Sequence, residues 1–165
     1  MPAPPTSPFP EPNERNGYLE HHARLLLASY SRWTGRVLVD AGLPPVEQAR
    51  RLFTAPFAVL SHDTAADPVF NYGNRTALEL FELTWEELTR LPSRFSAEPL
   101  LRDERERLLA TVARQGYIDD YRGVRLARSG RRFRIEQATV WNVVDDAGVH
   151  HGQAATFERW EPLKP

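Results

Sequence analysis

The chain has 165 residues, a formal net charge of −1 and no cysteine. This length predicts one domain with room for a hydrophobic core, and the lack of cysteine excludes disulfides, thiolate metal sites and cysteinyl–flavin photochemistry. The near-neutral charge argues against a nucleic-acid binder. No apolar run is long enough for a membrane span, and the start has no signal-peptide pattern, so we expect a cytoplasmic protein with no membrane partner.

Proline dominates the N-terminus, where six of the 14 prolines fall within residues 1–12. Proline disrupts helices and sheet ladders, so residues 1–13 are predicted to form a disordered tail. We expect an N-terminal helical segment over residues 14–55. A first helix is predicted from Glu14 to Trp33 because apolar residues recur there at helical spacing, namely Leu19, Leu26, Tyr30 and Trp33. A shorter helix is predicted from Pro45 to Phe53.

Two short apolar runs follow, over residues 57–60 and 69–72, with a polar turn between them. This pattern predicts two antiparallel strands. Next, Asn74 can cap one helix, and Thr84 with Glu87 forms the capping box of a second. A third helix is expected to begin near Asp103 and to end at Gly116.

The C-terminal third is predicted to be a three-stranded meander, with turns at Gly130 and Gly148. In its middle strand a period-two pattern places six residues on one face: Phe133, Ile135, Gln137, Thr139, Trp141 and Val143. Residues 153–160 are expected to form the last strand. The element order predicts an α+β fold, with a five-stranded antiparallel sheet and short helices on one face, preceded by the N-terminal helices.

Few residues suit catalysis, and the usual metalloprotease, nucleotide-binding and hydrolase signatures are absent. Ser61, His62 and Asp63 are consecutive, so they cannot converge as a catalytic triad. His62 can be a structural residue, a pocket hydrogen-bonder or a metal or haem ligand. Arg94 lies in a loop where it can hold a carboxylate, and Gln153 needs a polar partner on an otherwise apolar strand face.

The element order resembles that of PAS domains, with Asn74 at the start of the first short helix and Trp85-Glu86-Glu87-Leu88 as the second. The chain also resembles the MEKHLA family, a PAS-related group. The most specific stretches are Asp67-Pro68-Val69-Phe70-Asn71-Tyr72-Gly73-Asn74 and Leu91-Pro92-Ser93-Arg94, and the resemblance spans about residues 18–160.

This resemblance implies a PAS-like MEKHLA domain over residues 56–161. The family includes stand-alone bacterial proteins and the C-terminal domain of plant homeodomain–leucine-zipper factors, where it is thought to sense a small molecule or to govern dimerisation. No homeodomain or zipper precedes the domain here, so we expect the stand-alone bacterial type. Haem-binding PAS domains use a histidine in the long helix before the meander. Residues 101–115 contain none. We therefore do not expect a haem cofactor, and His62 is the one residue left that could bind haem.

Three functions remain in competition. The first is a non-enzymatic PAS-like sensory module that binds a small organic ligand between sheet and helices, without metal, and signals through an unidentified protein partner. Its candidate ligand contacts are His62, Asn71, Tyr72, Trp85, Arg94, Trp141 and Gln153. The second is a ligand-free interaction module that forms a homodimer through the N-terminal helix. The third is a small cone-fold enzyme with His62 or Asp63 as base.

Overall fold

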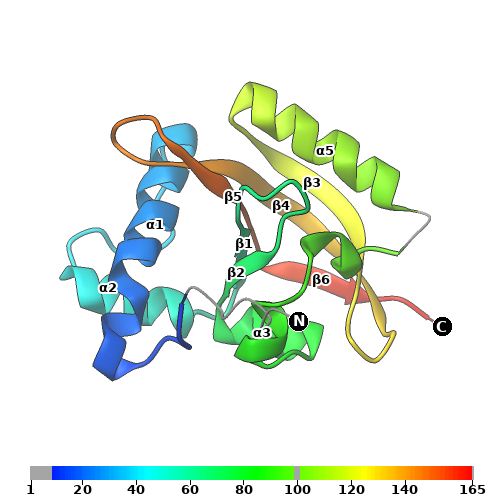
Figure 1. Cartoon of the computed structure of the whole chain (residues 1–165), viewed down its shortest axis with the longest axis horizontal. Coiled ribbons are helices and arrows are strands. Elements are labelled where there is room, and N and C mark those ends of the chain that lie inside the picture. Colours follow the sequence, from blue (N-terminus) through cyan, green and yellow to red (C-terminus); the bar gives the residue numbers. More distant parts are fainter. Residues whose placement is uncertain (1–8, 99–100, 165) are drawn as a thin grey trace, which may run out of the picture.

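The computed structural model describes residues 9–98 and 101–164, and it places an antiparallel sheet between two groups of helices (Figure 1). The strand order is β2-β1-β5-β4-β3, and a sixth strand, β6, pairs with β4. The strands are β1 Ala58–His62, β2 Phe70–Gly73, β3 Tyr117–Leu126, β4 Arg132–Val144, β5 His150–Phe157 and β6 Arg159–Pro162. The helices are η1 Glu14–Leu19, α1 Glu20–Thr34, α2 Pro45–Phe53, α3 Arg75–Phe81, α4 Trp85–Leu88, η2 Ser93–Ser96 and α5 Arg102–Gln115. The predicted α+β class is confirmed.

The first helix begins later than its apolar spacing predicts. Residues 14–19 form a distorted 3-10 turn, and the regular α-helix runs over α1. The reason is local, because Gly17, Tyr18 and Leu19 all have positive φ angles of 61°, 54° and 56°. Such angles cannot continue a right-handed helix. The second helix, α2, has the predicted bounds.

The strand pair β1–β2 is present as predicted, and it contains a β-bulge. Ser61 is opposite Tyr72 and His62 is opposite Phe70, so Asn71 is an extra residue in β2. A bulge redirects side chains. Asn71 and Tyr72 both face α1: the Ser61 hydroxyl donates to Asn71 Oδ1, and the Tyr72 ring lies 5.6 Å from the His22 ring.

The long strand β4 does not keep the single apolar face that its period-two pattern predicts. Phe133 and Ile135 pack on the α3 side of the sheet, whereas Trp141 and Val143 pack against α1. The faces exchange at Gln137, which has a φ of 47°. Between the pairs Ile135–Gly123 and Ala138–Tyr121, β4 contains one more residue than β3, and a shift of one residue reverses the faces of a strand.

The last predicted strand is divided in two. β5 ends at Phe157, and β6 begins at Arg159. β5 pairs with the second half of β4 and β6 with the first half, from Phe133 to Glu136. The chain therefore changes register near the point where β4 itself is irregular, and one continuous strand over residues 153–160 does not form.

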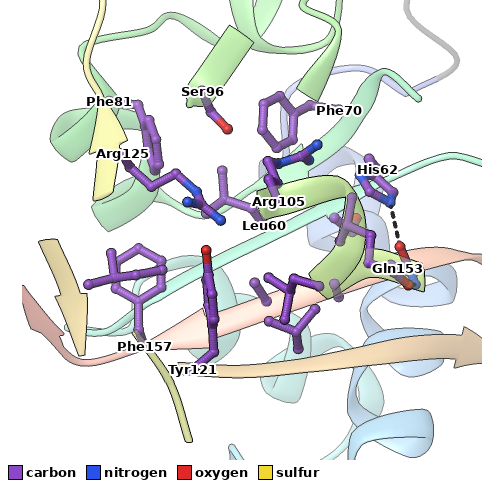
Figure 2. A pocket seen from close by; sticks show the side chains of 17 residues that line it. Leu60, His62, Phe70, Phe81, Ser96, Arg105, Tyr121, Arg125, Gln153 and Phe157 are labelled. Atoms are coloured by element: carbon purple, nitrogen blue, oxygen red, sulfur yellow. Dashed lines mark hydrogen bonds between the residues drawn. The ribbon is translucent and has the colours of Figure 1, made fainter. Parts of the chain in front are cut away.

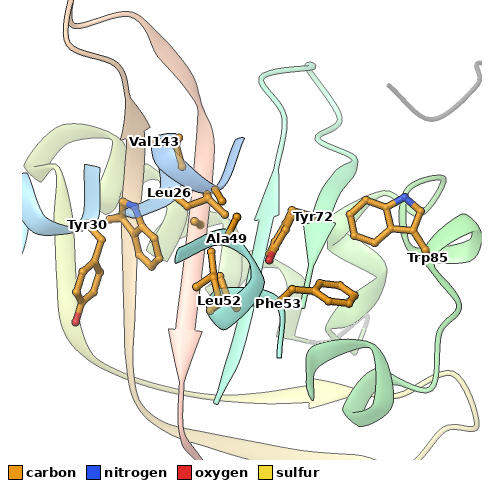
Figure 3. Packing of buried hydrophobic residues seen from close by; sticks show 12 residues of the cluster. Leu26, Tyr30, Ala49, Leu52, Phe53, Tyr72, Trp85 and Val143 are labelled. Atoms are coloured by element: carbon orange, nitrogen blue, oxygen red, sulfur yellow. The ribbon is translucent and has the colours of Figure 1, made fainter. Parts of the chain in front are cut away.

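Each face of the sheet has its own hydrophobic cluster. Helices α1 and α2 cover one face, where Leu26, Leu52, Tyr72 and Trp141 are fully buried (Figure 3). The Trp141 indole N–H donates to Ser29 Oγ at 3.0 Å, so α1 is joined to β4 by a buried polar contact as well. Helices α3 and α5 lie on the opposite face (Figure 1). Helix α4 lies beside β2 and contributes Trp85 to the first cluster and Leu88 to the second.

The N-terminal tail is described only in part. The tail prediction falls on residues 1–13, of which 1–8 lie outside the described residues. The Phe9 carbonyl accepts a hydrogen bond from the Trp85 indole N–H at 3.0 Å, and the Phe9 ring lies 5.0 Å from the His22 ring. In the described ranges, no helix is long and apolar enough to span a membrane.

Asn74 joins the strand pair to α3. Its side chain accepts from the N–H groups of Ala77 and Val59 and donates to the carbonyls of Leu52 and Phe57, all at 2.8–3.1 Å. Replacing Asn74 with Ala leaves buried backbone groups without partners. We expect Asn74→Ala to lower the free energy of unfolding by about 3 kcal/mol in urea titrations.

The capping residue Thr84 is the matched control, because it caps α4 at an exposed position with one backbone contact, to Glu87 N–H at 3.1 Å. Thr84→Ala is expected to cost about 1 kcal/mol. Equal losses for the two variants would show that Asn74 acts only as a helix cap.

Candidate functional site

A cavity of about 60 Å³ lies between the sheet and α5, on the face opposite α1 (Figure 2). Strands β1, β2, β3, β4 and β5, helices α3 and α5, and η2 contribute to its wall. The labelled lining residues are Leu60, His62, Phe70, Phe81, Ser96, Arg105, Tyr121, Arg125, Gln153 and Phe157.

The wall of this cavity is apolar along parts of β1, β2, β4, β5 and α3. Leu60, Phe70, Phe81, Ile135 and Phe157 line it there, and all five are buried. The polar side chains come from η2, α5 and β3, and from other positions of β1 and β5. An apolar wall with a few convergent polar groups is the usual composition of a small-molecule site.

A chain of hydrogen bonds begins at Arg105, beside the cavity. Arg105 Nη2 donates to Ser93 Oγ at 2.8 Å, and Ser93 Oγ lies 3.0 Å from His62 Nδ1. His62 Nε2 lies 3.2 Å from Gln153 Oε1. Gln153 Oε1 can only accept, so His62 carries its hydrogen on Nε2. In the neutral ring Nδ1 is then an acceptor, so the Ser93 hydroxyl donates to it and accepts from Arg105. One tautomer of His62 therefore satisfies every contact.

The same series of hydrogen bonds continues from Gln153 to the backbone of α5. Gln153 Nε2 donates to the Leu109 carbonyl at 3.0 Å and to Asn142 Oδ1 at 3.2 Å. Asn142 Nδ2 in turn donates to the Val112 carbonyl at 3.0 Å. Helix α5 is thus attached by hydrogen bonds to β4 and β5 directly and to β1 through Ser93. Its buried residues are Arg105 and Val112.

Burial sets the charge of this network. Burial, together with the nearby Arg105 guanidinium, lowers the pKa of His62 to about 4. Burial, reinforced by the nearby Arg125, lowers the pKa of Arg105 to about 10. At neutral pH His62 is therefore uncharged and Arg105 carries its positive charge.

Residues 20–162 match the sequence profile of the MEKHLA domain. This match covers most of the chain, from the start of α1 to the end of β6. The chain belongs to the MEKHLA family. The prediction from the residue stretches is confirmed at this level, whereas the stand-alone bacterial type stays a prediction.

Among curated proteins this MEKHLA chain is similar to plant homeobox–leucine zipper proteins. It is 32% identical over 146 residues to ATHB-9 of Arabidopsis thaliana, covering 83% of this chain and 17% of that protein. It is 27% identical over 143 residues to HOX32 of Oryza sativa subsp. indica, covering 84% and 16%. The chain therefore spans about a sixth of the length of these relatives.

Solved structures show the PAS fold. A PAS domain from Colwellia psychrerythraea superposes with a TM-score of 0.59 at 14% identity, covering 71% of this chain and 94% of that chain. A fungal light-oxygen-voltage (LOV) photoreceptor domain gives a TM-score of 0.55 at 14% identity, covering 84% and 88%. These identities are low, so the likeness establishes the fold alone.

The structure brings together two of the seven predicted ligand contacts of this MEKHLA chain, His62 and Gln153. Asn71 faces the other side of the sheet, the same side as Tyr72, because the bulge in β2 interrupts the alternation between them. Tyr72, Trp85 and Trp141 belong to the cluster under α1 and α2 (Figure 3). Arg94 lies on the surface, where it pairs with Asp67 at 3.0 Å.

Five polar residues that line the cavity were not among the predicted ligand contacts: Ser61, Ser96, Arg105, Tyr121 and Arg125. Arg105 stands within the charged run of residues 102–107, which is typical of a solvated helix face. The spacing of Arg105 from the apolar residues of the same helix could have identified it as buried. Arg105 lies three, four and seven residues before Leu108, Leu109 and Val112, so it shares their helix face.

The side chains of His62 and Asp63, which metal binding or base catalysis would use here, already make hydrogen bonds within the fold. Both ring nitrogens of His62 are engaged in hydrogen bonds, and Asp63 Oδ1 accepts from the N–H groups of Ala65 and Val69 in the turn. Within the part of the chain that the structure describes, no three His, Cys, Asp or Glu side chains gather as a metal site.

Proposed function

We propose that this MEKHLA chain is a non-enzymatic PAS-like sensory module that binds a small organic molecule in the α5-side cavity and signals through protein contacts. The observation that carries the proposal is the attachment of α5. The helix covers a cavity, and hydrogen bonds rather than a filled apolar core hold it to the sheet beside that cavity. Elements with few buried apolar contacts open at a low free-energy cost, so a ligand at this place can bias the position of α5.

A hydrogen-bonded connection between α5 and α1, on opposite faces of the sheet, supports the sensory interpretation. Asn142 contacts both layers of helices, because its side chain donates to the Val112 carbonyl of α5 and its own carbonyl accepts from the Trp33 indole N–H of α1 at 2.9 Å. We infer that a displacement of α5 reaches the N-terminal helix through Asn142. Helix α1 then offers a surface whose position depends on the cavity.

Related structures bind ligands of different sizes. One similar PAS domain, from a LuxR-family regulator of Burkholderia thailandensis, is described in complex with ethanol, and one LOV domain with a flavin analogue. A flavin does not fit here, since the cavity measures about 60 Å³, whereas pockets for drug-sized ligands begin at about 300 Å³. The chain also lacks the cysteine of a flavin adduct. A small ligand suits this cavity better.

The two alternative hypotheses, a homodimer and an enzyme, both depend on side chains that already make contacts within the fold. The apolar stripe of α1 that suggested a homodimer packs against its own sheet, with Leu26 and Tyr30 buried. The homodimer remains a prediction. The enzyme hypothesis needs His62 or Asp63 as a base, but His62 is held in a hydrogen-bond chain and Asp63 caps a turn.

Native and denaturing mass spectrometry of freshly purified protein tests the proposal. We expect the wild type to carry a small non-covalent mass that is lost on denaturation. Ala155 lines the cavity between Leu60 of β1 and Val140 of β4, so Ala155→Leu fills the space and should abolish the added mass.

The same change at an exposed alanine is the control. Ala147 lies in the β4–β5 turn, and Ala147→Leu should retain the added mass. A bare mass for the wild type in native spectra would contradict ligand binding and favour the ligand-free interaction module. Retention of the mass by Ala155→Leu would mean that the ligand binds elsewhere.

A further inference from the structure

We propose that the ligand of the cavity is a small carboxylic acid with an apolar body, whose carboxylate is bound by Arg105. This inference rests on the proposed function, because it names the chemical class of the molecule that the cavity binds. The charges around the cavity, and the partners that those charges have within the protein, support it.

Arg105 is a buried cation without a close counter-ion. The residue is 6% exposed, and its guanidinium makes one side-chain hydrogen bond, to Ser93 Oγ at 2.8 Å. In the described residues its nearest carboxylate is Glu106, at 3.9 Å, and the Glu106 side chain is 67% exposed. A guanidinium has five N–H donors, and a buried charge is costly unless it is paired.

A second positive charge faces the same space. Arg125 lines the cavity, half-buried, with its guanidinium carbon 5.3 Å from the centre of the Tyr121 ring (Figure 2). Its Nη1 donates to the Val124 carbonyl at 2.9 Å, and no carboxylate in the described ranges pairs with it. Two neighbouring cations repel each other, so an anion between them relieves both the repulsion and the missing pairing.

Several surface arginines of the same chain are better paired than the two at the cavity. Arg32, Arg94 and Arg134 each contact a carboxylate, at distances of 2.9, 3.0 and 2.7 Å, although water already solvates their charges. Among the described residues, Arg125 has no carboxylate contact and Arg105 has only that with the exposed Glu106, at 3.9 Å. Burial makes pairing more important for Arg105 than for any of the three. This contrast indicates that the partner comes from outside the chain.

The rest of the wall determines the kind of anion. Leu60, Phe70, Phe81, Ile135 and Phe157 offer apolar surface in the same cavity as the two arginines. The neighbouring His62 is uncharged at neutral pH because burial lowers its pKa to about 4. A polyanion would leave charge against this apolar wall. One carboxylate on a short aliphatic or aromatic body places the charge on the guanidinium and the body on the wall.

Calorimetric titration of the full chain with matched acids and amides tests the inference. The probes are the straight-chain carboxylates from butanoate to octanoate, with benzoate, and the amides of the same carbon skeletons. We expect at least one acid to bind at least about tenfold more tightly than its amide, because a carboxylate accepts charge-assisted hydrogen bonds from a guanidinium. This comparison requires no variant.

Three variants locate the effect. Arg105→Met should remove the preference for the acid, and Arg125→Met should reduce it. Arg122→Met is the matched control, because Arg122 lies on the same strand as Arg125, is largely exposed and pairs with Glu136 at 3.3 Å; it should keep the preference. If Arg105→Met does not fold, the wild-type ratio together with the Arg125 variant still decides the question.

The outcomes separate the carboxylate assignment from the sensory function. Amides that bind as tightly as acids would overturn the carboxylate assignment and leave a ligand-binding cavity. An acid preference that persists in Arg105→Met would overturn the role of Arg105. If no acid or amide binds, the carboxylate assignment falls. If the native spectra of the wild type also show a bare mass, the proposed function falls with it.

Discussion

Gly152→Ala is expected to destabilise the protein by more than about 4 kcal/mol, because the new methyl group collides with the backbone of the neighbouring strand. A Cβ at Gly152 would lie 1.9 Å from the carbonyl oxygen of His62, and φ at this residue is +132°. The backbone of β1 cannot move aside without losing its pairing with β5, where His62 is opposite Gln153. Urea denaturation at neutral pH measures the loss.

Gly148 is the matched control for this substitution. It also has a positive φ, of +80°, but nothing lies within 4 Å of the added Cβ. Gly148→Ala should cost only the backbone strain, about 1–2 kcal/mol. If the two variants lose equal stability, the close approach of β5 to β1 beside the cavity is not as the structure has it.

Acidification is expected to weaken the fold between about pH 6.5 and 4, because two buried histidines are neutral in the folded state. Burial lowers the pKa of both His22 and His62 from 6.5 to about 4. In this window the unfolded chain binds more protons than the folded one, so stability is complete above pH 6.5 and is lost as the pH falls. Each histidine contributes up to about 3 kcal/mol.

The two sites differ in their surroundings, so single variants separate them. His22 Nε2 contacts Ser61 Oγ at 3.0 Å under α1, whereas His62 lies on the cavity side. His22→Gln and His62→Gln should each reduce the slope of unfolding free energy against pH between pH 7 and 5. The exposed neighbour His21, changed to Gln, should leave that slope as in the wild type. A wild-type slope near zero would contradict the neutral, buried state of both residues.

Local signals in the sequence were sufficient for the order of elements. Asn74 caps α3 and the Thr84–Glu87 capping box opens α4, as their side-chain chemistry predicts. The strand pair and the meander follow from short apolar runs and turn residues. These features depend on neighbours within a few residues, and such signals can be read without knowing the tertiary structure.

A periodic pattern cannot predict where a strand has a bulge. Period two assumes an unbroken ladder, yet β2 has an extra residue at Asn71 and β4 reverses its faces near Gln137. This explains why Tyr72 and Trp141 were expected near the cavity and lie under α1 instead. Which face a strand residue occupies after a bulge depends on its partner strand, and that partner is not adjacent in sequence.

The charged sequence around Arg105 explains why this residue was not predicted as part of the site. His62 and Gln153 were predicted because polar residues in apolar strands need partners. Arg105 was not, because every residue from 102 to 107 is charged, and such a run is typical of a helix face in contact with water. Its spacing from Leu108, Leu109 and Val112 is the sequence feature that separates Arg105 from its charged neighbours, and the packing of α5 over the cavity shows that it is buried.

The cavity under α5 is tested most directly by methyl and indole NMR spectra of the full chain, titrated separately with hexanoate and with 1-hexanol. Saturable shifts are expected for the methyl groups of Leu60, Leu108 and Val140, which line the cavity, and for the Trp33 indole N–H, which is bonded to Asn142. The methyl groups of Leu26 and Leu52, buried under α1 and α2, should change little. Shifts confined to that second set, or no saturable shift with either probe, would contradict a ligand-binding cavity on this face.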